Sequence, residues 1–532
     1  MNYNNVPRMF RAQIEGRCQM QRLPTAKQDA YEWADQWIDG ASYDIPKFHH
    51  SIQRKTYRIS WRFVTNSGQD EGVIRPVIGA KGHPYYPGAS MKGAFLRKCT
   101  SEQAMKYCGG QIGNETKPGI LRFHGGYPQD STWKDKQLVD IVHPQQEFQV
   151  EKQISHSAFV QFSLHQPTLV FGISSNQKLG ETEWEEIWQI WQQALAEGIG
   201  SRVSAGYGHL KSHKENLLFP PIFLKGQGLA PKLINETGEF RPNMFKAAFR
   251  GHTLRLFAGV TNEAIAQKLT KKLWGGFNGQ SSYVGKLGIS FNAIELEMDT
   301  FQYLDLPLYD LREGKLEILC LGKMEEKERG NLKNLMLNIV KFSLLLGGFG
   351  KSWRRIDHRL FYPDYFRYNN KPMIGCHWEF IKNSQKLYIP INNLSDVKVF
   401  LDGLHLKFKT YVEKVEKEKL VEEGSDWREA WHPKRVQVFG RISDNYQDSE
   451  AVDWFHQEYQ RGKTIKNSPL TGNMGNVGRI WHRMYPRYIL ENKQLKKTRG
   501  FVEILTIFPD DSETTRDFLD YLESSRKFEK IW

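Results

Sequence analysis

The sequence predicts an α+β protein in which one module occurs twice. In both halves, a helix start combines a lysine, a small residue and Ala-Phe, at Lys92 and again at Lys246. In both halves, a glycine-rich loop also follows a later helix, at Gly198 and Gly348. Roughly 100 residues separate the two landmarks in each half, which is typical of an internal repeat.

The first module is predicted to occupy residues 1–217 and to carry an N-terminal extension. Ser90 is the expected N-cap of its lysine-containing helix. A Trp-rich helix leads into its glycine-rich loop. The expected elements are strands at 56–64, 74–80 and 119–127 and helices at 91–108 and 182–196.

The second module is predicted to occupy residues 218–532, with Asn243 as the N-cap of its lysine-containing helix. We expect its tail to supply closing strands and a large insertion near 390–475. The alternation of strands and helices fits a ferredoxin-like β-α-β-β-α-β unit in each copy. The expected elements are a strand at 218–224, helices at 243–257, 331–346 and 404–424, and paired strands at 480–490 and 501–511.

The charge balance favours a polyanionic partner. Lys and Arg number 74 against 60 Asp and Glu, which gives a net charge of +14. A surplus of this size attracts polyanions, of which nucleic acid is the commonest. Aromatic residues make up 13% of the chain, which fits either rings that stack on bases or ordinary aromatic cores.

The five cysteines are widely spaced and form no CxxC pair, so we expect reduced thiols in a cytoplasmic protein. The N-terminus lacks the apolar segment of a signal peptide. No apolar run reaches the roughly 18 residues of a membrane span, so no membrane association is expected.

The glycine-rich loops and the helix starts are both suited to bind anions. Amide groups of a glycine turn can surround an anion, and arginine side chains match phosphate geometry. The string GGFGKS is not a nucleotide-binding P-loop, because Leu345 replaces the first glycine and the loop closes a helix instead of opening one. The glycines also suit a plain helix-to-strand turn, and the lysines suit an ordinary solvent-facing position.

Several of these motifs resemble those of the repeat-associated mysterious proteins, the RAMP superfamily. PYYPGASMKGAFLR resembles the family segment P-x-I-P-G-S-S-L-K-G-x-x-R, and GIGSRVSAGYGHLK resembles the family's C-terminal glycine-rich loop. GILRFHGGY resembles its mid-module strand. In the second half the match is looser, because Ala247 replaces a glycine and the closing G-Y-G is missing.

The resemblance implies a fused, double-module backbone subunit of a type III CRISPR effector complex in a prokaryotic cytoplasm. Its expected partners are guide (CRISPR) RNA, target RNA, other RAMP-family proteins and large-subunit proteins. Each module would be RNA-recognition-motif-like, and a β-hairpin thumb is expected near Gln137–Lys152. RNA would be bound through its shape and its phosphates. The residues expected to bind RNA are Lys92, Arg97, Gly198, Gly200, Ser201, Arg202, Gly206, Gly208, Lys246, Arg250, Gly348, Gly350, Lys351, Trp353, Arg354 and Arg355.

Several family members cut target RNA with a metal ion, through an Asp just before the P-x-I-P-G-S-S segment. Ile74 occupies the best-aligned position, and Asp70 lies four residues earlier in the same loop. We therefore expect Asp70 to be the catalytic residue and Mg²⁺ ligand if the first module cuts; no organic cofactor is expected. A solvated turn carboxylate is the alternative. His124, Asp140 and His143 are further candidates in the first module.

The second module offers only Glu236 and Glu239 in the matching loop, so we expect it to be inactive. Two other functions remain open at this point: a guide-processing endoribonuclease, which shares the fold, and a non-catalytic protein-interaction scaffold. A guide-processing enzyme of this class works through a His near its first helix, and no His occupies that place clearly.

Overall fold

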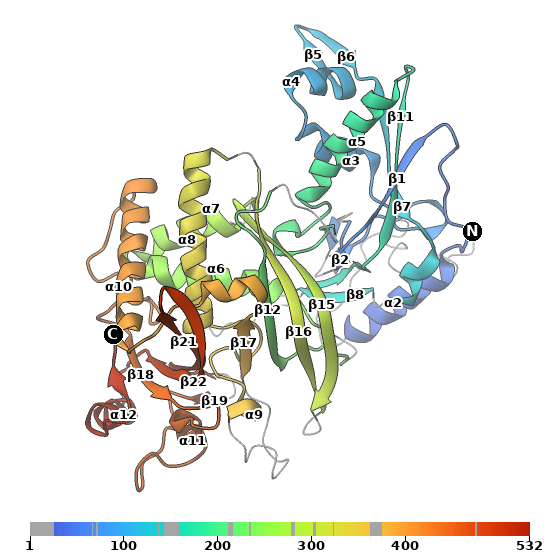
Figure 1. Cartoon of the computed structure of the whole chain (residues 1–532). Helices are drawn as coiled ribbons and strands as arrows, with labels where there is room; N and C mark the ends of the chain where they lie inside the picture. The colour runs from blue at the N-terminus through green and yellow to red at the C-terminus, as the bar shows by residue number, and fades with distance from the viewer. Residues whose placement is uncertain are drawn as a thin grey trace.

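The computed structural model confirms a mixed α and β architecture (Figure 1). Residues 1–25, at the start of the expected N-terminal extension, and most of the expected thumb lie outside the residues that the structure describes. The described residues are 26–65, 68–70, 73–136, 138–142, 159–210, 216–233, 236–277, 282–301, 305–322, 324–361, 375–473 and 476–532.

The first unit, in the upper right of Figure 1, is built on the antiparallel sheet β1-β11-β7. Helices α3 and α5 pack against one face of this sheet, where the α5 residue Trp191 contacts Phe171 of β11. Beside β1, the described residues form a fourth strand position through the antiparallel bridge between Ile59 and Leu210. The elements are β1 (Gln53–Arg58), α3 (Gly88–Leu96), β7 (Leu121–Pro128), β11 (Thr168–Ser175) and α5 (Glu181–Ala196).

The second unit holds the four-stranded antiparallel sheet β15-β16-β12-β17. Helices α6 and α7 contact strand β15 of this sheet, and both α7 and α8 pack on α6. The elements are β12 (Ile222–Leu229), α6 (Asn243–Ala258), α7 (Glu263–Trp274), β15 (Leu287–Phe301), β16 (Leu306–Cys320), α8 (Glu326–Leu345) and β17 (Cys376–Phe380).

The C-terminal tail forms a separate four-stranded antiparallel sheet, β21-β22-β18-β23, and adds no strand to the second sheet. This differs from the expectation that the tail completes the second module. The paired strands predicted at 480–490 and 501–511 are confirmed as β21 and β22. The elements are β18 (Gln437–Ser443), α11 (Glu450–His456), β21 (Ile480–Glu491), β22 (Gln494–Ile507), α12 (Glu513–Ser524) and β23 (Glu529–Lys530).

The three units share one chain order. Within each unit the strands follow the order 4-1-3-2 across the sheet when they are numbered along the chain. Helices follow the first and the third strand in every case. The same order of strands and helices therefore occurs a third time, in a part of the sequence that lacks the lysine and glycine motifs.

The remaining elements cap the sheets or connect them. A second small sheet, β3-β4-β9-β8, lies in the first half of the chain, and α2 contacts its strand β8. The longer of these elements are α2 (Ala26–Gly40), β3 (Gly68–Asp70), β4 (Val73–Arg75), β5 (Gly109–Ile112), β6 (Glu115–Pro118), β8 (Val139–Val142), β9 (Phe159–Phe162) and α10 (Ser395–Thr410). The shortest are β2 (Arg62–Phe63), α4 (Ser101–Gln103), β10 (Leu164–His165), β13 (Gly276–Phe277), β14 (Ser282–Tyr283), α9 (His358–Phe361), β19 (Gly472–Asn473) and β20 (Asn476–Val477).

Several predicted boundaries are wrong. Pro87 and Pro242, rather than Ser90 and Asn243, occupy the N-cap positions of α3 and α6. Proline suits these positions because it fixes φ and its missing amide has no helical partner there. The helix expected from Leu404 begins at Ser395, since its buried apolar stripe already starts at Val397.

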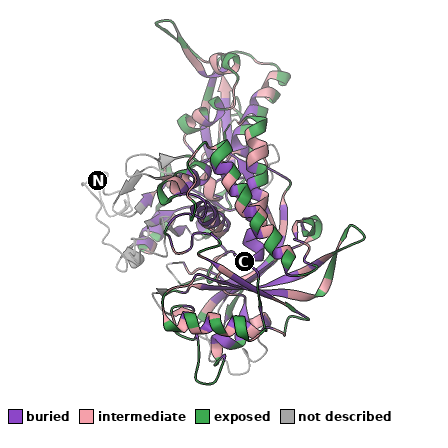
Figure 2. Ribbon diagram, turned by 90° about the vertical axis from the view of Figure 1, so that its left-hand side faces the viewer, coloured by how far each residue is buried: buried purple, intermediate pink, exposed green. Residues whose placement is uncertain are grey.

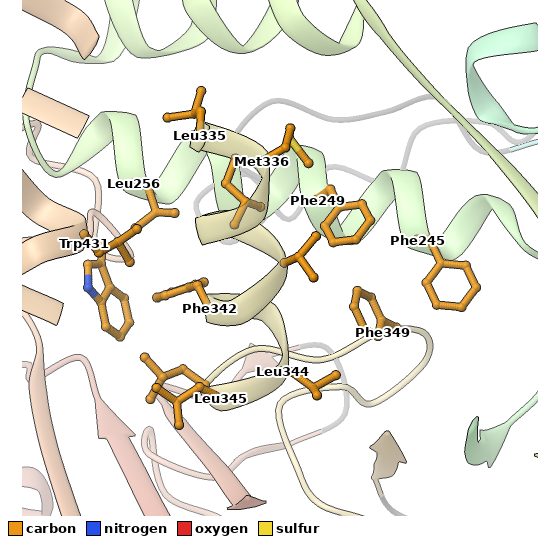
Figure 3. Close-up of a cluster of buried hydrophobic side chains, with 14 of the residues drawn as sticks. Phe245, Phe249, Leu256, Leu335, Met336, Phe342, Leu344, Leu345, Phe349 and Trp431 are labelled. Carbon is orange, nitrogen blue, oxygen red and sulfur yellow. The ribbon is translucent and has the colours of Figure 1, made fainter. Parts of the chain in front are cut away.

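One large hydrophobic core joins the second and third units. Helices α6 and α8 contribute Phe245, Phe249 and Phe342. Figure 3 shows Phe342 next to Trp431, and Phe245 and Phe249 next to Phe349. The same cluster includes Trp481 of β21, so the second and third sheets are not separate globules. Figure 2 shows the buried residues concentrated in the sheets and in the helix faces turned toward them.

No described helix is long and apolar enough to cross a lipid bilayer. Four of the five cysteines lie in the described part of the chain. All four are free thiols, as predicted; Cys99 is half-buried and the others, Cys108, Cys320 and Cys376, are buried.

Candidate functional site

A basic cavity of about 320 Å³ lies between the start of α6 and the glycine-rich loop that follows α8. The structure brings together here two motifs that are roughly 100 residues apart in the sequence. None of the described residues that line the cavity is acidic. The basic lining residues are Arg241, Arg250, Arg255, Lys351 and Arg354.

The loop after α8 is held against the protein core at its first half. Phe349 is buried against Phe245 and Trp378. Gly348 is tightly packed, because an added Cβ would lie 2.0 Å from a guanidinium nitrogen of the buried Arg483 and 2.9 Å from the carbonyl oxygen of Trp353. Gly350 has a φ of +89°, a conformation that favours glycine. This half fixes the position of the exposed Lys351 and half-buried Trp353 at the cavity.

Behind the cavity wall, one carboxylate holds two arginines. Glu429 is fully buried and lies 2.5 Å from Arg255 and 2.9 Å from Arg354, measured from carboxylate oxygen to guanidinium nitrogen. Burial alone would raise the pKa of Glu429, but the two guanidinium groups outweigh it and hold the pKa at about 2. Glu429 is therefore ionised at neutral pH, and the triad keeps a net positive charge.

Tryptophan rings surround this triad. The guanidinium of Arg255 lies 5.1 Å from the ring centroid of Trp353 and 5.5 Å from that of Trp427. Arg354 lies 4.6 Å from the ring of Trp353. Such contacts stabilise a cation over an aromatic face. Lys351 adds an exposed positive charge at the mouth of the cavity. The cavity therefore offers both cations and aromatic rings to a ligand, a combination that suits phosphates and bases.

Lys246, which was predicted to bind phosphate, is only 7% exposed. Its Nζ lies 2.6 Å from the hydroxyl of Ser204 in the first unit. Burial, followed by repulsion from Arg250 and Arg202, lowers the pKa of Lys246 to about 7. Lys246 therefore contacts the first unit rather than solvent in this structure.

The first glycine-rich loop also lies at the junction between the first and second units. Its backbone is hydrogen-bonded to β2 and to the residue that follows β2. The amide of Gly208 donates to the carbonyl of Arg62 at 2.8 Å, and the amide of Ser201 donates to the carbonyl of Val64 at 2.9 Å. Gly198, Gly206 and Gly208 are buried, and only Gly200 of the predicted loop residues is exposed. The sequence left two alternatives for this loop, an anion site and a plain helix-to-strand turn. These hydrogen bonds support the turn.

A buried carboxylate completes this junction. Asp140 is fully buried and accepts hydrogen bonds from Tyr207 (2.7 Å) and from Arg241 of the second unit (2.5 Å). Arg202, in the left-handed conformation with a φ of +60°, donates to the side chain of Gln161 at 3.0 Å. Sequence reasoning placed Asp140 among catalytic candidates, whereas its contacts are those of a structural ion pair.

The other predicted RNA-binding residues lie apart from the cavity. Lys92 and Arg97 are exposed on α3 and just after it, in the first unit. Arg355 turns toward the third unit, where it donates to the carbonyl of Ile480 and lies over the ring of Phe455. These placements leave Arg250, Gly350, Lys351, Trp353 and Arg354 as the predicted residues that meet at one site.

The prediction of a metal site at Asp70 stays a prediction, because the side chain of Asp70 lies outside what the structure describes. Asp70 ends strand β3 and pairs through its backbone with Val73 of β4. No group of three His, Cys, Asp or Glu side chains suited to a metal occurs in the described part of the chain. His124 bonds to Ser174, and Glu239 pairs with Arg62, so neither is poised as a ligand; His143 lies outside the described residues.

Trp427 and Glu429 were not predicted as site residues from the sequence; both lie in the segment predicted to be an insertion. One signal could have found them. Arg255 occurs within the apolar run Leu254–Ala258, and a cation at a buried helix position needs a carboxylate partner.

Comparison with known proteins gives limited matches. No family model and no curated protein matches the chain. Among solved structures, a chain of the type III-B Cmr-beta complex bound to cognate target RNA is 19% identical, with a TM-score of 0.24. The match covers 31% of this chain and 58% of that one, so our chain spans little more than half its length. The crystal structure of Cmr6 from Pyrococcus furiosus is 14% identical, with a TM-score of 0.20, over 31% of this chain and all of Cmr6.

Proposed function

We propose that this chain is an RNA-binding backbone subunit of a type III CRISPR effector complex. The RAMP-like motifs of the sequence suggest this class. The strand order 4-1-3-2 with two crossing helices supports ferredoxin-like units of the kind that the class uses. The proposed ligand is the guide RNA, held through its phosphates, with target RNA and other complex proteins as further partners.

The observation that carries this proposal is the cavity between α6 and the second glycine-rich loop. It combines Lys351 at its mouth, the ring of Trp353 and the guanidinium of Arg354. Because its described lining has no acidic residue, a phosphate entering it meets no opposing carboxylate. RNA backbone contacts of this type read charge and shape rather than sequence.

The test is the salt dependence of RNA binding by the full chain. In Lys351→Gln, the affinity for a single-stranded RNA of about 20 nucleotides should fall. The slope of log affinity against log salt should flatten by about 0.7, because one phosphate contact is lost. Fluorescence anisotropy of labelled RNA at several salt concentrations measures both quantities.

Lys333→Gln is the matched control, since Lys333 is an exposed lysine on α8 outside the cavity lining. It removes the same charge from the helix that leads into the loop. We expect the control to keep the wild-type slope. Equal effects of the two substitutions would show that the cavity has no special role, and the proposal would then be rejected.

Cleavage of target RNA by the first module, with Asp70 and Mg²⁺, stays a prediction. In the assembled complex, Asp70→Ala should abolish cutting at the sites served by this subunit if Asp70 is catalytic. Cleavage at every site with unchanged rate would reject the role of Asp70 and favour a purely RNA-holding subunit.

A further inference from the structure

The first sheet has one face that the helices do not cover. Leu169, Phe171 and Ile173 of β11 point toward the helices, as the 5.1 Å contact between Phe171 and Trp191 of α5 indicates. Successive residues of a strand alternate between faces. Thr168, Val170 and Ser174, all half-buried, therefore point the other way, onto what we call the open face; Gly172, on the same side, is buried beneath the ring of Phe48.

The strand register places three arginines on this open face. Arg58 and Arg54 of β1 pair with Thr168 and Gly172, and Arg122 of β7 pairs with Ser174. All three arginines are exposed. None forms an ion pair with any residue that the structure describes, so their charge is available to a ligand.

Aromatic rings lie beside these arginines. Tyr127 of β7 pairs with Val170 and thus faces the same side. Tyr85 stacks on it, with ring centroids 5.5 Å apart and planes tilted by 16°. Phe48 lies 6.0 Å from Tyr127 and 6.2 Å from His124.

The backbone fixes Tyr85 in this position. The next residue, Tyr86, exchanges two hydrogen bonds with Gly126 of β7, at 2.8 and 3.0 Å, and so extends the sheet by one edge pair. The ring of Tyr86 packs inward against Phe171. Tyr85 is therefore held on the opposite side, next to Tyr127.

We propose that the open face binds single-stranded RNA, with bases stacked on Tyr85 and Tyr127 and phosphates held by Arg54, Arg58 and Arg122. Stacking on aromatic rings together with arginine contacts is the usual chemistry of single-strand binding. No acidic side chain of the described strands β1, β7 and β11 faces this side. An exposed sheet with aromatic rings accommodates about two or three bases, whereas paired bases in a duplex cannot reach it.

This surface is separate from the cavity next to Lys351, so RNA binding here goes beyond the function proposed for the cavity. The choice of RNA over DNA as the ligand rests on that proposed function. The test uses the full chain and a labelled uridine decamer. Tyr127→Ala should weaken binding about ten-fold, because one stacking partner is lost. Tyr127→Phe keeps the ring and should stay within about two-fold of wild type. Double-stranded RNA should not compete at this site.

Two adjacent residues of β1 provide a control for charge. Arg54 lies on the open face, whereas Lys55 points to the helix face, with its Nζ 5.6 Å from the ring centroid of Trp188. Arg54→Gln should weaken binding and Lys55→Gln should not. Equal effects of both would overturn the proposal. So would wild-type RNA affinity in Tyr127→Ala, a result that would instead favour a protein partner on this face.

Crosslinking keeps the test decisive if Tyr127→Ala does not fold. Wild-type protein is irradiated with a decamer that carries 4-thiouridine, and the crosslinked peptides are identified by mass spectrometry. Crosslinks to the tryptic peptide 123–134 support the proposal, and their absence there refutes it. If Lys351→Gln loses RNA binding and Tyr127→Ala keeps it, the cavity is supported as the RNA site and the open face is rejected. If Tyr127→Ala loses binding and Lys351→Gln keeps it, only the cavity is rejected.

Discussion

Replacing Glu429 by glutamine tests the charge balance around the cavity. The side chain is fully buried between Arg255 and Arg354, and its pKa of about 2 lies below the ordinary value of 4.5. This difference corresponds to about 3 kcal/mol of folding free energy at neutral pH. Since removal of one partner from a buried ion pair costs about 3–5 kcal/mol, Glu429→Gln should lower the free energy of unfolding by that amount.

The pH dependence gives the sign of the effect. Because folding lowers the pKa of Glu429, its contribution is complete above the unfolded-state value of 4.5 and is lost as the pH falls toward about 2. The difference in stability between wild type and Glu429→Gln should therefore be constant from about pH 8 to about pH 5 and should narrow below that. Urea unfolding followed by tryptophan emission measures it, because Trp353 and Trp427 adjoin Arg255.

Glu423→Gln is the control, since Glu423 is exposed and pairs with Lys434 at 2.7 Å on the surface. Exposed pairs of this kind contribute little, so this variant should unfold close to wild type. A stability loss of equal size in both variants, or a gap for Glu429→Gln that does not depend on pH below 5, would refute the interpretation of Glu429 as a buried counter-ion.

Two further predictions concern the junction of the first and second units. Folding lowers the pKa of Lys246 from 10.5 to about 7, so the unfolded chain binds more protons between these values. Wild-type stability should therefore rise between about pH 7 and about pH 10, by at most about 1.4 kcal/mol per pH unit. Urea titrations of Lys246→Met should lack this rise, and an unchanged rise would contradict the lowered pKa of Lys246. Asp140→Asn leaves Arg241 without its buried carboxylate and should lower the free energy of unfolding by about 3–5 kcal/mol. Asp130→Asn, at an exposed turn, should lower it by under about 1 kcal/mol. Calorimetry compares the two variants, and similar melting temperatures would disprove the prediction.

The regular elements were largely predictable because they depend on local patterns. The Trp-rich helix was expected at 182–196 and occupies Glu181–Ala196, since its apolar spacing and flanking glycines mark both ends. Strands β7 and β21 were also found from their own residues. Boundaries failed where proline decided them, as at β12, which begins only after Pro220 and Pro221.

The site was predictable only in part, because burial and pairing depend on the tertiary structure. The sequence indicated Lys351, Trp353 and Arg354 as one cluster, and the structure brings them to the cavity. It did not indicate that Lys246 faces Ser204 of the other unit. No local pattern separates a lysine that ends at a junction from one that faces solvent.

The junction has a consequence for dissecting the protein. A break after residue 217 would leave Asp140 and Tyr207 on one fragment and Arg241 on the other, so an anion and a cation that are now desolvated together would each be exposed to water. Lys246 would lose Ser204 by the same cut. The two halves, made separately, should therefore recombine when mixed, and the stability of either half alone would underestimate that of the intact chain.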